Sequence, residues 1–112
     1  MPRLDFFVDY KLFLRVALEA ESQTIGRSSE CEVQLTDAKV SRRHAQITVD
    51  ADGAYWIENL SSNGTRLNAA MLAAKTVLSP GDRVYIGDYV MIYHPEDAPP
   101  LKDEDQETLL EE

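Results

Sequence analysis

The stretch Leu4-Asp-Phe-Phe-Val-Asp-Tyr-Lys-Leu-Phe-Leu-Arg-Val-Ala-Leu18 alternates apolar and other residues. The alternating apolar positions are Leu4, Phe6, Val8 and Tyr10, followed by Leu12, Leu14, Val16 and Leu18. Successive side chains of a β-strand point to opposite faces, so a period of two indicates strands that each bury one face. The beginning of the chain therefore predicts β-strands with all eight of these side chains on buried faces.

The same pattern returns along most of the chain. Ala45, Ile47 and Val49 alternate again, and short runs rich in β-forming residues cover 24–26, 33–35, 55–58, 65–67, 84–86 and 89–93. Turn-forming sequences, Asp52-Gly53, Asn63-Gly64, Pro80-Gly81-Asp82 and Gly87-Asp88, separate these runs. This spacing predicts an all-β sandwich or barrel.

Residues 68–75, Asn-Ala-Ala-Met-Leu-Ala-Ala-Lys, have the alanine content of a helix, and Asn68 could cap one. The segment is short, however, and lies between two strand runs, where packing can override helix propensity. We therefore expect a hairpin here.

The composition limits the chain to one modest core. The 112 residues are 44% hydrophobic, enough for one domain without disulfides. Cys31 is the only cysteine and is accompanied by only two histidines, so the sequence predicts no disulfide, no zinc site and no cofactor. No apolar stretch has the length of a secretory or membrane-spanning segment, which favours a cytoplasmic protein without membrane insertion.

The net charge of −9 is unevenly distributed. Residues 96–112 hold eight acids and one lysine, whereas residues 1–95 have a net charge of only −2. We expect a folded domain at 1–95 and a Pro-containing acidic tail at 96–112 that is disordered. A nearly neutral domain also argues against a nucleic-acid-binding surface, which would be broadly basic.

Half of the basic residues before position 95 fall in predicted loops or at strand ends, together with hydroxyl and amide side chains. The cations are Arg27, Lys39, Arg42, Arg43 and Arg66, and the polar residues include Ser28, Ser29, Ser41, Ser61, Ser62, Asn63 and Thr65. A phosphate group presents three strong acceptor oxygens and about −1.5 to −2 charge at pH 7. The loops therefore predict an anion site.

Five ordered blocks of the sequence resemble the forkhead-associated (FHA) domain family. They are Thr24-Ile25-Gly26-Arg27, Ser41-Arg42-Arg43-His44-Ala45, Asn59-Leu60-Ser61-Ser62-Asn63-Gly64-Thr65, Asn68, and Leu78-Ser79-Pro80-Gly81-Asp82. The resemblance covers roughly residues 4–94. It implies an eleven-stranded antiparallel β-sandwich that binds phosphothreonine peptides through loops at one end.

The resemblance also implies roles for individual residues. Arg27 and Ser41 look like phosphate ligands, with Arg42 as a third, while Asn63 would hold the ligand backbone and Ser62 would complete the pocket. Gly26, His44, Gly64, Thr65 and Asn68 would support the binding loops, and Lys39 is a candidate for selecting an acid after the phosphothreonine. Glycine commonly follows Asn68 in the family, so Ala69 is a departure that brings the local turn into question.

Two functions from different classes follow. The first is a phosphothreonine-dependent interaction module in signalling, docking a protein modified by a Ser/Thr kinase, as in bacterial regulators. The alternative is a phosphate-independent assembly domain of a larger complex such as a bacterial secretion or regulatory system. An enzyme is not expected, because no carboxylate pair, activated nucleophile or phosphate-binding loop before a helix is present.

The tail adds one more hypothesis. Thr108 lies in an acidic context, Glu107-Thr-Leu-Leu-Glu111, and its phosphorylated form could bind the site of this chain or of another copy.

Overall fold

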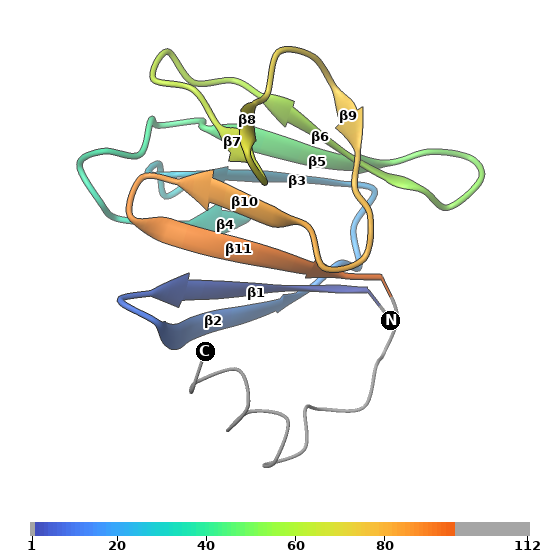
Figure 1. The fold of residues 1–112 in the computed structure, drawn as a ribbon, viewed down its shortest axis with the longest axis horizontal. Coiled ribbons are helices and arrows are strands. Elements are labelled where there is room, and N and C mark those ends of the chain that lie inside the picture. The colour runs from blue at the N-terminus through green and yellow to red at the C-terminus, as the bar shows by residue number, and fades with distance from the viewer. Residues whose placement is uncertain (1, 96–112) are drawn as a thin grey trace.

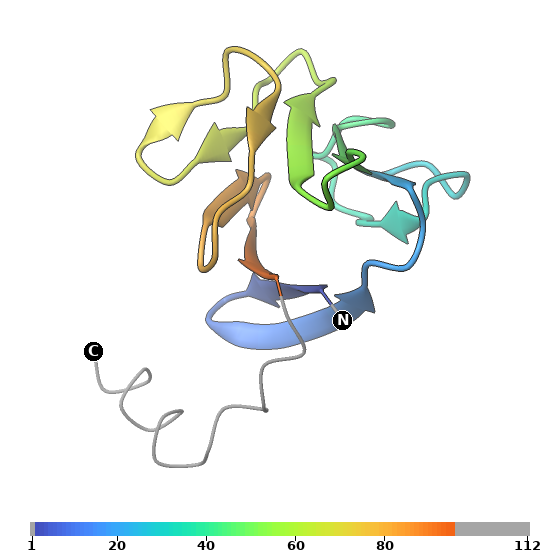
Figure 2. The ribbon, with the colours of Figure 1, turned by 90° about the vertical axis from the view of Figure 1, so that its right-hand side faces the viewer.

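The structure, a computed structural model, describes residues 2–95 as two packed β-sheets (Figures 1 and 2). The eleven strands of this part of the chain are β1 (Arg3–Val8), β2 (Lys11–Ala17), β3 (Ser22–Gly26), β4 (Val33–Gln34), β5 (Ala45–Val49), β6 (Tyr55–Asn59), β7 (Arg66–Leu67), β8 (Ala70–Met71), β9 (Thr76–Val77), β10 (Arg83–Ile86) and β11 (Tyr89–His94). The predicted eleven-stranded sandwich is confirmed. Residues 96–112, with the predicted disorder of the tail and the Thr108 hypothesis, lie outside the described residues.

The two sheets contain six and five strands. The six-stranded sheet has the order β2-β1-β11-β10-β7-β8, and the five-stranded sheet has the order β4-β3-β5-β6-β9. The pairing is antiparallel except between β3 and β4, which run parallel. The first and last strands, β1 and β11, lie side by side in the six-stranded sheet.

The core lies between the sheets and is filled from both. Leu4, Phe6 and Met91 of the six-stranded sheet are fully buried, as are Ile47 and Ile57 of the five-stranded sheet. Their alternation along each strand is the one that the sequence shows, because only one face of each sheet is covered by the other. Within residues 2–95 there is no helix long and apolar enough to span a membrane.

The first hairpin differs from the prediction in two places. Asp9 and Tyr10 form its two-residue turn with φ of 53° and 66°, and Tyr10 is 93% exposed. A β-bulge between Phe6 and Phe7 then shifts the register, so that Leu12 pairs with Phe7 on the outer face of the sheet and is 48% exposed. The expectation that Tyr10 and Leu12 face the core was therefore wrong. Tyr10 is in the turn between the strands, and the extra residue of the bulge reverses the facing of Leu12.

The predicted hairpin over residues 68–75 is confirmed, with β7 and β8 joined by Asn68 and Ala69. Only Asn68 has a positive φ, 55°. Asn68 donates through Nδ2 to Asp82 Oδ1 at 3.0 Å and accepts through Oδ1 from the Arg83 amide at 3.0 Å. An alanine is tolerated at position 69 because asparagine takes the left-handed conformation at the position before it.

Candidate functional site

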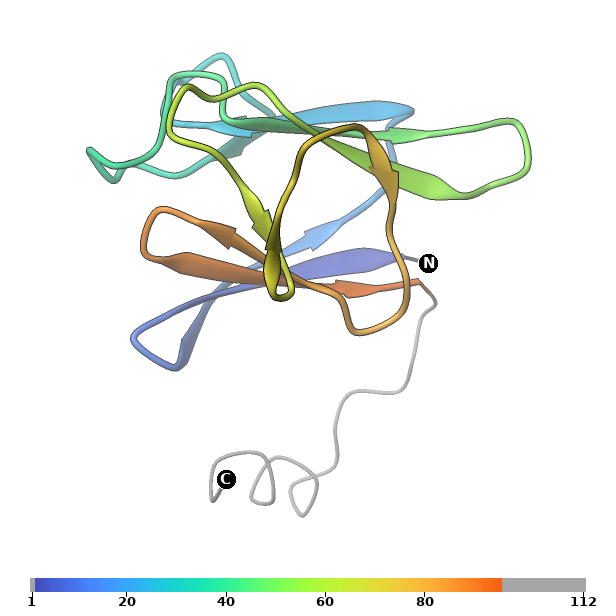
Figure 3. The same ribbon diagram turned by 45° about the horizontal axis from the view of Figure 1, so that its top comes forward.

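Four loops that carry most of the predicted site residues lie on one side of the sandwich. In Figures 1 and 3 the β3–β4, β4–β5, β6–β7 and β10–β11 connections are all on the left, whereas the β5–β6 turn is on the right. The first three contain residues 27–32, 35–44 and 60–65. The fold thus places segments that are far apart in sequence next to one another.

Arg27 and the Ser41 segment are joined by hydrogen bonds. The Arg27 amide donates to the Ser41 carbonyl at 2.9 Å, and the Ser28 amide donates to the Arg42 carbonyl at 3.1 Å. The Arg27 side chain also donates through Nε to the Val40 carbonyl at 3.0 Å. These bonds fix the Arg27 guanidinium beside Ser41 and leave its two terminal nitrogens for another acceptor.

Gly26 makes this approach possible. It ends β3 and is buried, and a Cβ added to it would overlap the backbone carbonyl of Arg42. Its φ is not positive, in contrast to Gly64, whose φ is 94°. Gly26 is therefore required because two backbones pack closely at this point. The conformational freedom that glycine gives to a turn is not the reason.

His44 connects the second loop to the third. Its ring is buried, with Nδ1 accepting from the Ser41 amide at 3.0 Å and Nε2 lying 3.0 Å from the Gly64 carbonyl. Because Nδ1 accepts, the proton of the neutral ring is on Nε2 and is donated to Gly64. Burial lowers the pKa of His44, which favours this neutral form. The histidine thus orders two binding loops from within.

Asn59 organises the third loop and was not singled out from the sequence. Its Oδ1 accepts from the Ser61 hydroxyl at 2.6 Å, the Ser61 amide at 3.1 Å and the Thr65 hydroxyl at 2.8 Å. Ser61 Oγ in turn accepts from the Gly64 amide at 2.9 Å. Ser62 and Asn63 are exposed at the tip of the loop that this network closes. The sequence signal was Asn59 at the end of a strand with hydroxyls two and six residues later.

A shallow groove of about 490 Å³ adjoins Asn63. Lys39, His44, Asn63, Gly64, Arg66, Met71, Tyr85 and Gly87 line it. The Arg66 guanidinium stacks 4.0 Å above the Tyr85 ring. Lys39 lies at the groove, but its ammonium is paired with Asp88 at 3.0 Å, and this carboxylate raises the pKa of Lys39.

The predicted phosphate ligands keep their donors unused. Within residues 2–95, the Arg27 terminal nitrogens, the Ser41 hydroxyl and the side chains of Arg42, Ser62 and Asn63 make no hydrogen bond or ion pair. Arg27, Arg42, Ser62 and Asn63 are exposed. These donors are guanidinium, hydroxyl and amide groups, which are the kinds of donor that bind an anion.

The side chains of the other two predicted residues, Thr65 and Asn68, are bonded within the protein. Thr65 is fully buried and donates to Asn59. Asn68 contacts Asp82 and Arg83 at the β7–β8 turn, so it is held apart from the loops that carry Arg27 and Ser41. In the described part of the chain, no group of three or more His, Cys, Asp and Glu side chains could hold a metal ion.

Comparison with known proteins gives concordant matches. The FHA domain family matches residues 23–87. The oxoglutarate dehydrogenase inhibitor of Corynebacterium diphtheriae is 36% identical over 80 residues, which are 70% of this chain and 54% of that protein. The chain thus spans about half the length of the curated relatives it matches.

Solved structures match over most of the chain. A chain from a study of phosphothreonine-dependent FHA domain interactions has a TM-score of 0.71 and 29% identity, and the match covers 82% of this chain and 95% of that one. An FHA domain from Chlamydia trachomatis has a TM-score of 0.76 and 22% identity over 83% of this chain and 95% of that one, a likeness of fold.

Proposed function

This chain belongs to the FHA domain family, and we propose from that premise that it is a phosphothreonine-dependent interaction module. The observation that carries the proposal is that the loops holding Arg27, Ser41 and Asn63 are joined by hydrogen bonds, from the Arg27 amide to Ser41 and through His44 from Ser41 to Gly64. The side-chain donors of all three residues that could reach a phosphate are unused within residues 2–95, which supports a shared ligand.

Each ligand has a distinct chemical role in the proposal. Arg27 presents two terminal nitrogens in a plane, which suits two phosphate oxygens. The Ser41 amide is already bonded to His44, so Ser41 contributes its hydroxyl. Arg42 adds a second positive charge from the same segment. Asn63 can accept from and donate to a peptide group of an extended ligand, and Ser62 beside it adds a hydroxyl.

Gly26, His44, Gly64, Thr65 and Asn68 support this arrangement in the proposal. The first four act on the binding loops directly, by close backbone packing or by the hydrogen bonds described above. Asn68 acts at a greater distance, by fixing the turn after β7.

Lys39 is proposed to select an acidic ligand residue following the phosphothreonine. It shares the groove with Asn63, so a peptide held by Asn63 passes close to it. Because Asp88 already pairs with the Lys39 ammonium, a ligand carboxylate must compete with Asp88. Both partners are more than half exposed, and an ion pair in solvent is stabilised only weakly, so a ligand carboxylate can displace Asp88.

The proposed partner is a protein that carries a threonine phosphorylated by a Ser/Thr kinase. Docking without catalysis in the cytoplasm is the expected action, with residues 1–95 as the binding domain and 96–112 as an appended tail. The similarity to a protein named as an inhibitor of oxoglutarate dehydrogenase supports a regulatory setting.

The decisive experiment measures affinity for a phosphothreonine peptide library and its unphosphorylated counterpart by titration. Hydrogen bonds to charged groups contribute about 1.5–3 kcal/mol, so Arg27→Ala should weaken phosphopeptide binding about 10- to 100-fold. Lys75→Ala is the matched control, since it removes an exposed charge that lies outside the binding loops. Equal affinity of the wild-type chain for both libraries would end the proposal and favour a phosphate-independent assembly domain.

The self-binding hypothesis enters the same titration. A peptide of residues 102–112 phosphorylated on Thr108 is compared with a phosphopeptide of scrambled sequence. Tighter binding of the native peptide, lost in Arg27→Ala, supports self-recognition, whereas equal binding removes it.

A further inference from the structure

The outer face of the six-stranded sheet is the second notable surface of the molecule. Strand register places on it Leu12, Arg15 and Ala17 of β2, Arg3, Asp5 and Phe7 of β1, Val90, Ile92 and His94 of β11, Arg83 and Tyr85 of β10, Arg66 of β7 and Met71 of β8. No described element packs over this face (Figures 1 and 2). At its β7–β8 end, Arg66, Tyr85 and Met71 also line the groove beside Asn63. The lining of that groove does not include Arg15, Arg83 or the apolar residues of β1 and β11.

The charge of this outer face is opposite to that of the chain. Four arginines and one aspartate give it a net charge of +3, although residues 1–95 as a whole carry −2. Burial lowers the pKa of His94, so this imidazole adds no full charge near neutral pH. The arginines are therefore concentrated on one surface of an otherwise acidic protein.

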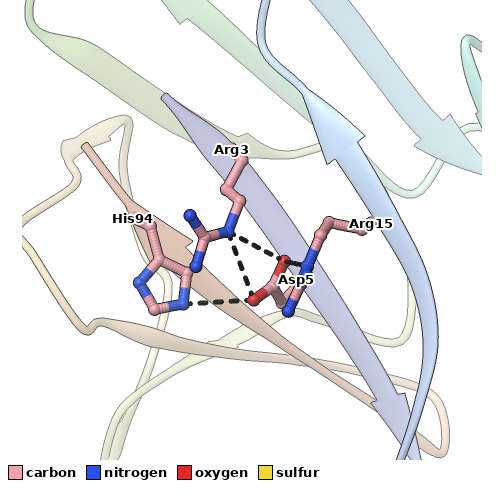
Figure 4. Close-up of polar contacts among 4 residues, drawn as sticks. All are labelled: Arg3, Asp5, Arg15 and His94. Atoms are coloured by element: carbon pink, nitrogen blue, oxygen red, sulfur yellow. Dashed lines mark hydrogen bonds and ion pairs between the residues drawn. The ribbon is translucent and has the colours of Figure 1, made fainter. Parts of the chain in front are cut away.

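Asp5, the one acid of the outer face, is covered by cations (Figure 4). Its carboxylate is 4% exposed and lies 3.0 Å from Arg15 Nε, 3.4 Å from Arg3 Nε and 3.3 Å from His94 Nε2. The Arg15 side chain is still 48% exposed. A ligand approaching the outer face thus meets guanidinium groups, with the carboxylate beneath them.

Apolar side chains lie between the cations. Phe7, Val90 and Ile92 are each only half-buried, although they occupy neighbouring positions on the central strands β1 and β11. Tyr85 continues this row under the Arg66 guanidinium. A fitting occupant would combine carboxylates with a few apolar side chains, since both kinds of contact are offered.

Residues 96–112 have that composition. They carry eight acids and one lysine together with Leu101, Leu109 and Leu110. The segment continues directly from β11, whose last residue, His94, is on the outer face beside Arg3. Seventeen residues reach about 55 Å when extended, while six strands span about 24 Å, so the segment can cross the whole face.

We propose that the acidic segment 96–112 docks on the outer face of the six-stranded sheet of its own chain, with carboxylates on Arg15 and Arg83 and leucines on the Phe7–Ile92 row. The contact is reversible and electrostatic, so it weakens as salt screens the charges. It does not require the phosphothreonine site, and its failure would leave that proposal intact.

Paramagnetic relaxation enhancement measured in the unphosphorylated 112-residue chain tests the proposal. A nitroxide is attached at Gln106→Cys, a position that leaves every acid of the segment in place. Cys31→Ser removes the native thiol and keeps a donor for the Arg42 carbonyl. At low ionic strength we expect loss of at least half of the amide signal intensity at Phe7, Ile92 and Arg83, with recovery at 0.5 M NaCl. Absence of broadening, or broadening centred on the Arg27 and Ser41 loops or the five-stranded sheet, would overturn the proposal.

Two controls define the contact. Arg83→Glu should restore the amide signals of the outer face. Lys75→Glu is a matched charge reversal at an exposed site elsewhere and should leave the broadening unchanged. Equal effects of the two substitutions would refute the charge pairing. A second control mixes nitroxide-bearing chain of natural isotope abundance with ¹⁵N-labelled chain that carries no nitroxide. The ¹⁵N-labelled chain should show no broadening at low concentration. Broadening in that mixture would mean that the segment docks on another copy, which contradicts docking within one chain.

Discussion

Two polar side chains, the buried His44 and the partly buried Asn59, hold the candidate site in shape before any ligand arrives. His44 joins Ser41 to Gly64, and Asn59 closes the loop that presents Asn63. Neither is placed to touch a phosphate in the proposed arrangement, since their polar atoms are already used within the protein. Pre-formed loops reduce the ordering entropy that binding must otherwise overcome.

His44 should make the stability of the domain depend on pH. Its pKa is lowered in the folded state by burial, so the unfolded chain binds the proton more tightly. Its stabilising contribution is therefore complete above about pH 6.5 and is lost as the pH falls from 6.5 toward the lower folded pKa. Urea unfolding should give a lower free energy at pH 5 than at pH 7.5.

His94 contributes to the same pH dependence, because burial lowers its pKa as well. The carboxyls with lowered pKa values, Glu32, Asp37 and Asp50, lose their contributions only below about pH 4.5, outside this window. His44→Gln and His94→Gln should each remove part of the slope between pH 5 and 6.5. If His44→Gln leaves the slope unchanged, the assigned protonation state is wrong.

Asn59→Ala should destabilise the domain by about 1–3 kcal/mol, because the buried Thr65 hydroxyl loses its acceptor. Asn63→Ala is a matched control in the same loop: its side chain is exposed and makes no hydrogen bond within residues 2–95. Chemical denaturation should show the loss only for Asn59→Ala, while phosphopeptide titration should show weaker binding for both. Full stability of Asn59→Ala would contradict the network.

At the scale of elements, the end of β3 and the β7–β8 turn show two ways in which backbone geometry selects a residue. Gly26 is needed because another backbone passes too close for a Cβ, whereas Asn68 is needed because its φ is 55°. The first constraint comes from a distant loop and the second from the turn itself.

Gly26→Ala should cost about 3 kcal/mol and also weaken phosphopeptide binding, because β3 and the Arg42 segment must move apart. Gly53→Ala is the comparison: it has open space but a φ of 85°, so it should cost about 1–2 kcal/mol and leave the affinity unchanged. Thermal unfolding and peptide titration together separate the two effects. An affinity equal to wild type in Gly26→Ala would show that the loops adjust freely.

At the β7–β8 turn, Asn68→Ala should be less stable than Asn68→Gly by about 1 kcal/mol. Both lose the bonds to Asp82 and Arg83, but only alanine resists the positive φ. Ala69→Gly should not stabilise the protein, since the φ of residue 69 is not positive. Urea midpoints of the three variants test this assignment, and a gain in stability for Ala69→Gly would refute it.

For the whole molecule, the loops with unused donors and the arginine-bearing outer face of the six-stranded sheet are two surfaces that meet at the groove lined by Arg66, Tyr85 and Met71. Within residues 2–95, side chains from both sheets form one hydrophobic core.

A chain ended after residue 95 should keep its free energy of unfolding within about 1 kcal/mol and its phosphopeptide affinity within a factor of about five. Denaturation and titration of the shortened and full chains provide the measurement. A shortened chain that fails to fold would show that residues 96–112 belong to the domain.

Local patterns were sufficient for much of this protein. Alternation gave the strands, the surroundings of residues 68–75 indicated a hairpin instead of a helix, and clustered loop cations with hydroxyls indicated an anion site. These features depend on residues close together in sequence, where side-chain periodicity and backbone preference act directly. The sequence blocks then identified the family that the comparisons confirm.

Only the tertiary structure decided the features that depend on register and on distant contacts. The bulge beside Phe7 turned Leu12 outward, and the Arg42 carbonyl made Gly26 obligatory. Strand order gathered four arginines on one face, two of which pair with Asp5. A shift of one residue reverses a strand's faces, and contacts between separate loops exist only once the sheets have packed. The periodicity of the sequence therefore predicts neither the register shift nor the contacts between loops.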